Sequence, residues 1–307
     1  MPAGKIPCGI AIPQMLVTAE VRFLRDFLAR AEALGYDSVW VQEQILGDAP
    51  MLEPITLLTF AAALTSRVRL GTSVILPLTR HPIHLAKALA TLDQLSGGRF
   101  ILGVGIGGPH VPEPPFGIPR ENRARRFVEG IRVMKALWTE PHATFAGEFW
   151  KFENLAIEPK PLQKPHPPIW FGARDEVALK RTVRHGDGWM GAGSSTAADF
   201  IAQSAMLRQL LEEAGRDPMK FPVSKRVYLA IDDNRERAQQ RLRAWFGERY
   251  KNAEMASRVS IWGGVNECVD KLGELVRAGA RHFLLNPVFD DTEHLEKLAS
   301  DVMPKLQ

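Results

Sequence analysis

The chain has 307 residues, of which 45% are apolar and 24% are charged. These proportions predict one large globular domain, or two small ones, with a sizeable core. No run of 18 or more uncharged apolar residues occurs, and the N-terminal segment lacks the pattern of a signal peptide, so we expect no membrane contact. Cys8 and Cys268 have no second ligand or base at a useful spacing, which predicts two buried thiols in a cytoplasmic protein.

The formal net charge is +4 and the isoelectric point is about 9.1. Basic residues gather within 120–126 and again within 180–184. Solvated helix faces are the favoured interpretation, and a field that attracts an anionic ligand is the alternative. Nucleic acid is disfavoured as a partner because no basic stripe is interleaved with aromatic residues.

Short apolar segments alternate with amphipathic helical patterns along the chain. The first expected helix ends at Gly35, and the second begins at Glu53-Pro54, where proline suits the first turn. Strands are expected at 5–12, 38–42, 69–76, 99–106, 169–172, 188–191, 223–231 and 282–287, with a further short one at 259–262. Helices are expected at 20–34, from 53 onward, and at 83–95, 121–138, 176–185, 197–214, 235–257, 266–278 and 293–303.

Strands separated by helices favour parallel pairing, because parallel neighbours need long crossovers. Eight such repeats in one chain predict a (β/α)8 TIM barrel that forms a single domain over residues 1–307. The proline- and aromatic-rich stretch 139–168 interrupts the alternation between strands 4 and 5, and it is expected to contain a small hairpin near 144–152. A doubly wound open sheet is the structural rival, but no G-x-G-x-x-G follows the first strand.

Catalytic residues of such barrels lie at the C-terminal ends of the strands. The run GVGIGG at 103–108, at the end of strand 4, has glycine at alternating positions, including Gly105 and Gly107. One face of the strand therefore carries no side chains there. A flat ring could then approach the backbone. A barrel that needs small residues to close is an equally good explanation.

Two loops place glycines and hydrogen-bond donors just before a helix. They are FGARDE at 171–176 and MGAGSS at 190–195. Backbone N–H groups at a helix N-terminus bind phosphate, which favours a phosphate site here, and ordinary N-capping is the alternative. The candidate residues are Gly172, Ala173, Arg174 and Asp175 in the first loop and Gly191, Ala192, Gly193 and Ser194 in the second.

Glu43 and Gln44 follow strand 2, where a carboxylate could act as a base or orient a substrate hydroxyl. A structural salt bridge is an equally good interpretation for Glu43. His110, in the loop after strand 4, is a candidate proton donor, although a lone loop histidine is more often just exposed. No metal site is expected, because His81 and His84 lack further ligands, and no G-x-S-x-G elbow is present.

Several segments resemble the luciferase-like monooxygenase superfamily, in the expected order and over nearly the whole chain. Within it, the sequence is most similar to oxidoreductases that use the deazaflavin coenzyme F420. The similar segments are SVWVQEQ (38–44), RVRLGTSVILPLTRHPIHLAKALATLDQLSGGRFILGVGIGG (67–108), the stretch 129–173, HGDGW (185–189) and WGGVNECVDKLGELVRAGARHFLL (262–285).

The resemblance implies that Ser73-Val74 forms a bulge with a non-prolyl cis bond under the deazaflavin ring. It also implies that residues 173–178 and 191–194 hold the phosphate. Two positions depart from the family pattern. Gln44 replaces a histidine and cannot shuttle a proton near neutral pH, and Gly108 stands where sugar-phosphate dehydrogenases of the family have a catalytic glutamate. His110 or Glu113 remains as a candidate proton donor.

We therefore expect a coenzyme F420-dependent oxidoreductase that transfers a hydride between C5 of the deazaflavin and a small organic substrate. An apolar or aromatic substrate is expected, lying among Met15, Met51 and the Phe149–Trp150 stretch. An FMN-dependent two-component monooxygenase is the first alternative, and a non-catalytic flavin-binding barrel is the second. Family members are commonly homodimers, and the apolar helices at 55–64 and 83–95 could supply such an interface.

Overall fold

The computed structural model describes residues 5–15, 21–108 and 114–306. Its strands, in chain order, are β1 (Cys8–Ala11), β2 (Ser38–Val41), β3 (Arg69–Thr72), β4 (Phe100–Val104), β5 (Ala143–Ala146), β6 (Lys151–Leu155), β7 (Ile169–Gly172), β8 (Gly188–Gly191), β9 (Val223–Ile231), β10 (Ser260–Gly263) and β11 (His282–Pro287). Its helices are α1 (Val21–Ala33), α2 (Pro54–Leu64), α3 (Pro82–Leu95), α4 (Arg123–Thr139), α5 (Glu176–His185), α6 (Ala197–Glu213), α7 (Arg235–Tyr250), α8 (Met255–Val259), α9 (Val265–Arg277) and α10 (Asp291–Lys297), with short 3-10 turns η1 (Pro77–Thr79) and η2 (Pro114–Phe116).

The main sheet has the strand order β10-β9-β11-β1-β2-β3-β4-β7-β8, and β8 pairs in addition with β9. That additional pairing closes eight strands into a ring, with β10 attached outside it. Alternating strands and helices around a closed parallel sheet define a (β/α)8 barrel. The fold class predicted from the sequence is therefore confirmed, including the insertion between the fourth and fifth ring strands.

Contacts between Cα atoms divide the chain into two compact units, which we describe separately. The first unit comprises residues 1–13, 18–40 and 171–307, and the second comprises residues 14–17 and 41–170. Within the described residues, no helix combines the length and the apolar character needed to cross a bilayer.

In the first unit, the nine-residue strand β9 is buried along its whole length. It pairs in parallel with β8, β10 and β11, and β11 continues through β1 to β2. A parallel strand covered on both faces is expected to be apolar throughout. β9 departs from this rule at Lys225 and Arg226, which are both buried.

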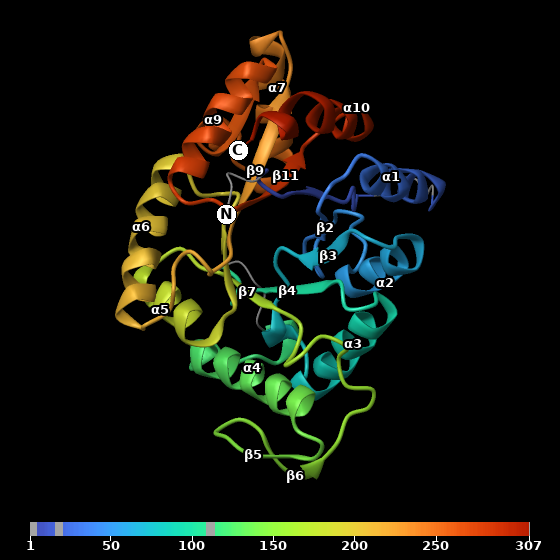
Figure 1. Ribbon diagram of the computed structural model, residues 1–307, viewed down its shortest axis with the longest axis vertical. Helices are drawn as coiled ribbons and strands as arrows, with labels where there is room; N and C mark the ends of the chain where they lie inside the picture. The colour runs from blue at the N-terminus through green and yellow to red at the C-terminus, as the bar shows by residue number, and fades with distance from the viewer. Residues whose placement is uncertain (1–4, 16–20, 109–113, 307) are drawn as a thin grey trace. The chain divides into compact units, whose positions relative to one another are not determined.

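In the second unit, β3 pairs in parallel with β4, and α3 packs against α4. The expected hairpin is confirmed as β5–β6, which lies beside α4 at the edge of this unit (Figure 1). Glu129 of α4 ties the hairpin down, because its carboxylate accepts hydrogen bonds from the N–H groups of residues 148–150 at 2.8–3.0 Å. The aromatic residues at the tip are therefore fixed against α4.

Two of the expected helices were wrong in extent. The stretch predicted as one helix over 235–257 breaks into α7 and α8, because Lys251 adopts a left-handed conformation with φ 54° and ends α7. The last helix begins at Asp291 rather than at 293, and it continues past Leu298 with irregular helical turns.

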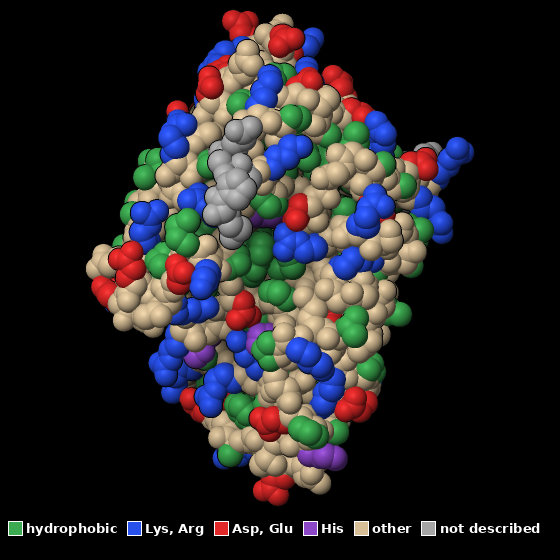
Figure 2. All heavy atoms as spheres, in the orientation of Figure 1, with side chains coloured by type: hydrophobic (Ala, Val, Ile, Leu, Met, Phe, Trp, Pro, Cys, Tyr) green, Lys and Arg blue, Asp and Glu red, His purple; other side chains and the backbone are tan. Residues whose placement is uncertain are grey.

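Charged side chains of both signs are interspersed over the face shown in Figure 2. In the two basic clusters noted in the sequence, Arg125 pairs with Glu148 at 2.9 Å and Lys180 pairs with Glu176 at 2.6 Å. These exposed pairs fit the interpretation of solvated helix faces, and such pairs contribute little to stability.

Candidate active site

In the first unit, residues 192–195 connect β8 to α6, and we call this segment the anion loop. Thr196 and Asp199 cap α6 reciprocally through side-chain and backbone hydrogen bonds. Gly193 is buried, and neither its N–H nor that of Ser194 has an acceptor among the described residues. Buried N–H groups are almost always paired, so the free N–H of Gly193 indicates a position for a ligand acceptor.

The position of Gly193 admits no side chain. A Cβ atom placed there would lie 2.8 Å from Cε2 of Tyr228 and 3.3 Å from Cδ of Arg226. The glycine therefore allows the loop to pack closely against the side chains of β9. A phosphate fits this site, because backbone N–H groups at a helix N-terminus, helped by the helix dipole, suit an anion.

Three cationic side chains approach the anion loop. Arg174, from the loop after β7, donates to the hydroxyl of Ser194, so the two predicted phosphate loops are in contact. Lys225 Nζ donates to the carbonyl oxygens of Ala192 at 2.5 Å and Ser195 at 3.0 Å. Arg226 donates to Oδ1 of Asn286 at 2.5 and 3.1 Å.

The pKa of the Lys225 ammonium is lowered to about 7. Burial is the largest cause, and the positive charge of Arg174 is the second. Asp199 opposes this shift and Arg226 adds to it. Neither cation of β9 could be predicted as a site residue, because a charged residue inside a strand gives no local sign of what it contacts.

The other members of the predicted phosphate loops have structural neighbours of their own. Asp175 caps α5, since its carboxylate accepts from the N–H of Ala178 at 2.9 Å. Asp175 therefore acts as an ordinary N-cap residue, which was the alternative to phosphate binding. The carbonyl of Ala173 accepts from the indole of Trp189 at 3.0 Å. At Gly191, a Cβ would lie 2.7 Å from the ring of Phe200, so this glycine serves packing.

In the second unit, the peptide bond between Ser73 and Val74 is cis, as the family resemblance implied. The N–H of Ser73 donates to the carbonyl of Val41 at 2.7 Å. A Cβ at Gly105 would lie 2.7 Å from Cγ2 of Val74. The glycine after β4 thus makes room for the bulge after β3, and the next one, Gly107, is exposed with φ 85°.

Glu43 is engaged in an ion pair with Arg80, and its carboxylate also accepts from the N–H of Leu76. Its side chain is only 1% exposed. Burial raises the pKa of this carboxyl, and the charge of Arg80 acts in the opposite direction. Arg80 pairs in addition with Glu53 at 2.9 Å. The geometry at Glu43 is that of the structural salt bridge considered above.

The remaining acid–base candidates are less defined. Gln44 is half-buried beside Gly47. His110 and Glu113 lie outside the described residues. Cys8 and Cys268 are buried, and burial raises the pKa of each thiol to about 12. Among the described residues, no three His, Cys, Asp or Glu side chains come together in a way that could hold a metal ion.

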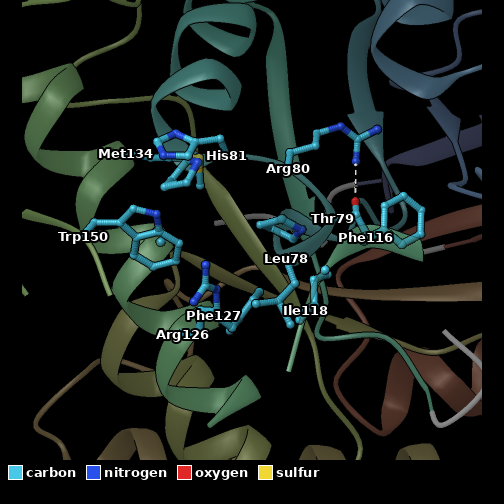
Figure 3. A pocket seen from close by; sticks show the side chains of 14 residues that line it. Leu78, Thr79, Arg80, His81, Phe116, Ile118, Arg126, Phe127, Met134 and Trp150 are labelled. Atoms are coloured by element: carbon cyan, nitrogen blue, oxygen red, sulfur yellow. Dashed lines mark hydrogen bonds between the residues drawn. The ribbon is translucent and has the colours of Figure 1, made fainter. Parts of the chain in front are cut away.

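A cavity of about 210 Å³ opens in the second unit between η1, the start of α3 and α4. It begins at Pro77, three residues after Val74. Trp150 and Arg126 face each other across its side, with the guanidinium 4.8 Å from the ring centre (Figure 3). Met15 and Met51 pair with each other in an isolated bridge and do not line this cavity. The lining is formed by Pro77, Leu78, Thr79, Arg80, His81, Pro82, Phe116, Gly117, Ile118, Arg126, Phe127, Gly130, Met134 and Trp150.

These features can be compared with known proteins. The model of the luciferase-like monooxygenase family matches residues 6–282, and the chain belongs to this family. The family resemblance found in the sequence is therefore confirmed.

Among curated relatives, an F420-dependent glucose-6-phosphate dehydrogenase of Kineococcus radiotolerans is 29% identical over 92% of this chain and 93% of its own length. Among solved structures, an F420-dependent secondary alcohol dehydrogenase in complex with an F420-acetone adduct has a TM-score of 0.86 and 21% identity, covering 99% of this chain and 100% of that one. The oxygenating constituent of 3,6-diketocamphane monooxygenase from Pseudomonas putida, in complex with FMN, has a TM-score of 0.79 and 18% identity, covering 99% of both chains. The two structures share the fold with this chain.

Proposed function

We propose that this protein is a coenzyme F420-dependent oxidoreductase that acts on a small organic substrate. The free, buried N–H of Gly193 carries the proposal, because it lies in a loop with three cations nearby and needs an acceptor. The F420-dependent relative supports the choice of the deazaflavin among phosphate-bearing cofactors.

Each region of the site has its own task in this proposal. The N–H groups of Gly193 and Ser194, with the Arg174 guanidinium, bind the phosphate. The bulge at Ser73-Val74, packed on Gly105, supports the ring. When bound, the deazaflavin supplies a hydride donor or acceptor at C5. The residues themselves orient the ring, bind its phosphate and exclude water.

Two of the acid–base candidates do not serve as the proton donor. Gln44 does not titrate near neutral pH. Glu43 is committed to Arg80 and Leu76, so we assign it to positioning the segment that follows the bulge. His110 is our candidate proton donor and Glu113 is the alternative, and both follow β4 in the sequence and lie outside the described residues.

For the substrate, we propose an apolar or aromatic molecule. The supporting observation is the cavity whose lining includes Trp150, Phe116 and Ile118, and which begins three residues after the cis peptide bond. These rings and the aliphatic side chain favour a flat apolar group, and Arg80, His81 and Arg126 on the same lining can contact a polar group of the substrate.

An FMN-dependent two-component monooxygenase is the alternative, and the likeness to the FMN-bound monooxygenase fold supports it. The anion loop suits either phosphate. A non-catalytic flavin-binding barrel is the second alternative, and Gln44 and Gly108 favour it because they replace acid–base residues of the family.

Titration of the purified protein with F420 and with FMN, followed by absorbance and fluorescence, tests the proposal. We expect tight binding of F420 and weak binding of FMN. Tight FMN binding without affinity for F420 would overturn the choice of cofactor. Turnover of F420 that falls on His110→Ala substitution would exclude the non-catalytic alternative. A cytoplasmic homodimer remains our expectation, and light scattering of the eluted protein checks the dimer.

A further inference from the structure

Lys225 lies at the level of the last residue of β8, since it is the register partner of Gly191. Its side chain is 3% exposed and passes the ring of Phe200, with Nζ 5.7 Å from the ring centre. The side chain passes close to Gly191, where a Cβ would lie 3.3 Å from Cδ of Lys225. The ammonium therefore ends directly behind the anion loop.

The ammonium is held by carbonyl oxygens alone. It donates to Ala192 and Ser195, and no carboxylate lies within ion-pair distance of it in the part of the chain that the structure describes. The carboxylate of Asp199 in α6 acts on the ammonium through its charge, and it accepts a hydrogen bond from the N–H of Thr196 at 2.9 Å. Arg174 and Arg226 repel it, and β11 presents Phe283 opposite it.

The carbonyl of Ala192 and the N–H of Gly193 belong to the same peptide unit. In a planar trans peptide these two groups point in opposite directions. A donor that holds the carbonyl of Ala192 toward β9 therefore turns the N–H of Gly193 away from β9. The N–H of Ser195 also donates to this carbonyl, at 3.1 Å, so the orientation is fixed from two sides.

We propose that Lys225 is a positioning residue of the anion loop, whose ammonium orients the N–H of Gly193 toward the phosphate of the bound cofactor and adds a buried positive charge behind it. This inference rests on the proposed function, since it requires a phosphate-bearing ligand in the loop.

A consequence for pH follows from the charge. The phosphate favours the ammonium over the neutral amine, so binding raises the pKa of Lys225 above its ligand-free value of about 7. Affinity is then highest at low pH and decreases as the pH rises past that value, because the free protein must take up a proton to bind.

The test compares F420 with the ribityl deazaflavin fragment that lacks the phosphate and the tail. Both share the ring, so ionisation of the ring cancels in the ratio of their dissociation constants. For the natural protein, we expect the preference for F420 to decrease between pH 6.5 and 8.5, by at most about tenfold for each pH unit. A charge worth roughly tenfold in affinity raises the pKa by about one unit, so calorimetry at pH 7.5 in two buffers should show uptake of about half a proton on F420 binding.

Lys225→Met removes the charge and keeps the length of the side chain. We expect its preference for F420 to be roughly tenfold lower at pH 6.5, to be constant with pH, and to show no proton uptake. Lys225→Arg keeps a cation that does not titrate, so its preference should stay high and flat. It also keeps the proposal testable if the methionine variant does not fold.

The outcomes separate the two proposals. If the natural protein shows no preference for F420 over the fragment at pH 6.5, the phosphate assignment fails, and this inference fails with it. If that preference is present but either variant keeps the pH slope and proton uptake of the natural protein, only the role of Lys225 is overturned.

Discussion

The anion loop and the network of Glu43, Arg80 and Glu53 each contain a buried charge, Lys225 in the first and Glu43 in the second, yet they are built in opposite ways. In the network, Arg80 pairs with two carboxylates, and Glu43 accepts a further hydrogen bond from Leu76. At the loop, Lys225 has only carbonyl partners, and the buried N–H of Gly193 has no acceptor among the described residues.

This difference indicates that the network of Glu43 is a structural site and that the anion loop is a binding site. A buried charge pair that satisfies itself needs no ligand, and breaking it destabilises the fold. A spare backbone donor and a buried ammonium that has no carboxylate partner gain a negative partner only when an anion binds. We therefore expect substitutions in the network to change stability, and substitutions at the loop to change affinity.

The largest effect is expected for Arg80→Met. It leaves the buried carboxylate of Glu43 without its cation, which should lower the free energy of unfolding by about 2–4 kcal/mol at pH 8. Because the pKa of Glu43 is already raised by burial and Arg80 counteracts that rise, the substitution raises it further. A raised carboxyl pKa destabilises the fold as the pH rises through it, so the deficit should shrink on acidification toward the unfolded value of about 4.3.

Urea unfolding at pH 5 and pH 8 measures this effect. Arg243→Met is the matched control, since Arg243 also pairs with a glutamate but both side chains are exposed, at 41% and 74%. Its loss should be under about 1 kcal/mol. A normal stability for Arg80→Met at pH 8, combined with a loss of turnover, would instead place Glu43 in the chemistry.

The next effect tests the loop. Gly193→Ala brings a methyl group to within 2.8 Å of Tyr228, so the loop must shift and its free N–H is displaced. Loss of a charge-assisted hydrogen bond should weaken F420 binding roughly 10- to 100-fold. Titration of F420 fluorescence measures the affinity. Gly247→Ala in α7 is the control, because its Cβ would make only an ordinary contact at 3.6 Å with Ala253. Equal affinity of both variants would show that the phosphate binds elsewhere.

The barrel could be predicted from the sequence because most ring strands are short apolar runs that alternate with helices. The bounds of β7, β8, β9, β11 and α5 are those expected. The break between α7 and α8 could not be foreseen, since it depends on a left-handed Lys251 rather than on a glycine or proline. Local patterns indicate a helix end only when the residue type itself favours it.

Site residues could be predicted only where their place at the end of a strand was enough to identify them. The loops after β7 and β8 were identified because barrels place their sites at the ends of strands. Lys225 and Arg226 were missed, since their partners come from other elements. Asp175, which was grouped with the cofactor ligands, turns back to cap its own helix. A side-chain oxygen before a helix fits both roles, and only tertiary structure separates them.

The smallest effect concerns the exposed edge of the loop. Arg174→Gln removes a charge that lies at the surface and donates to the Ser194 hydroxyl. Solvent screens such a charge, so we expect F420 affinity to fall only about two- to fivefold. The loss should appear mainly in the association rate and should vanish at high salt. Stopped-flow binding at low and high ionic strength measures both. The loss at Gly193→Ala is steric and should persist in salt. If the loss at Arg174→Gln also persisted, Arg174 would act by shaping the loop through Ser194 and not by attracting the anion.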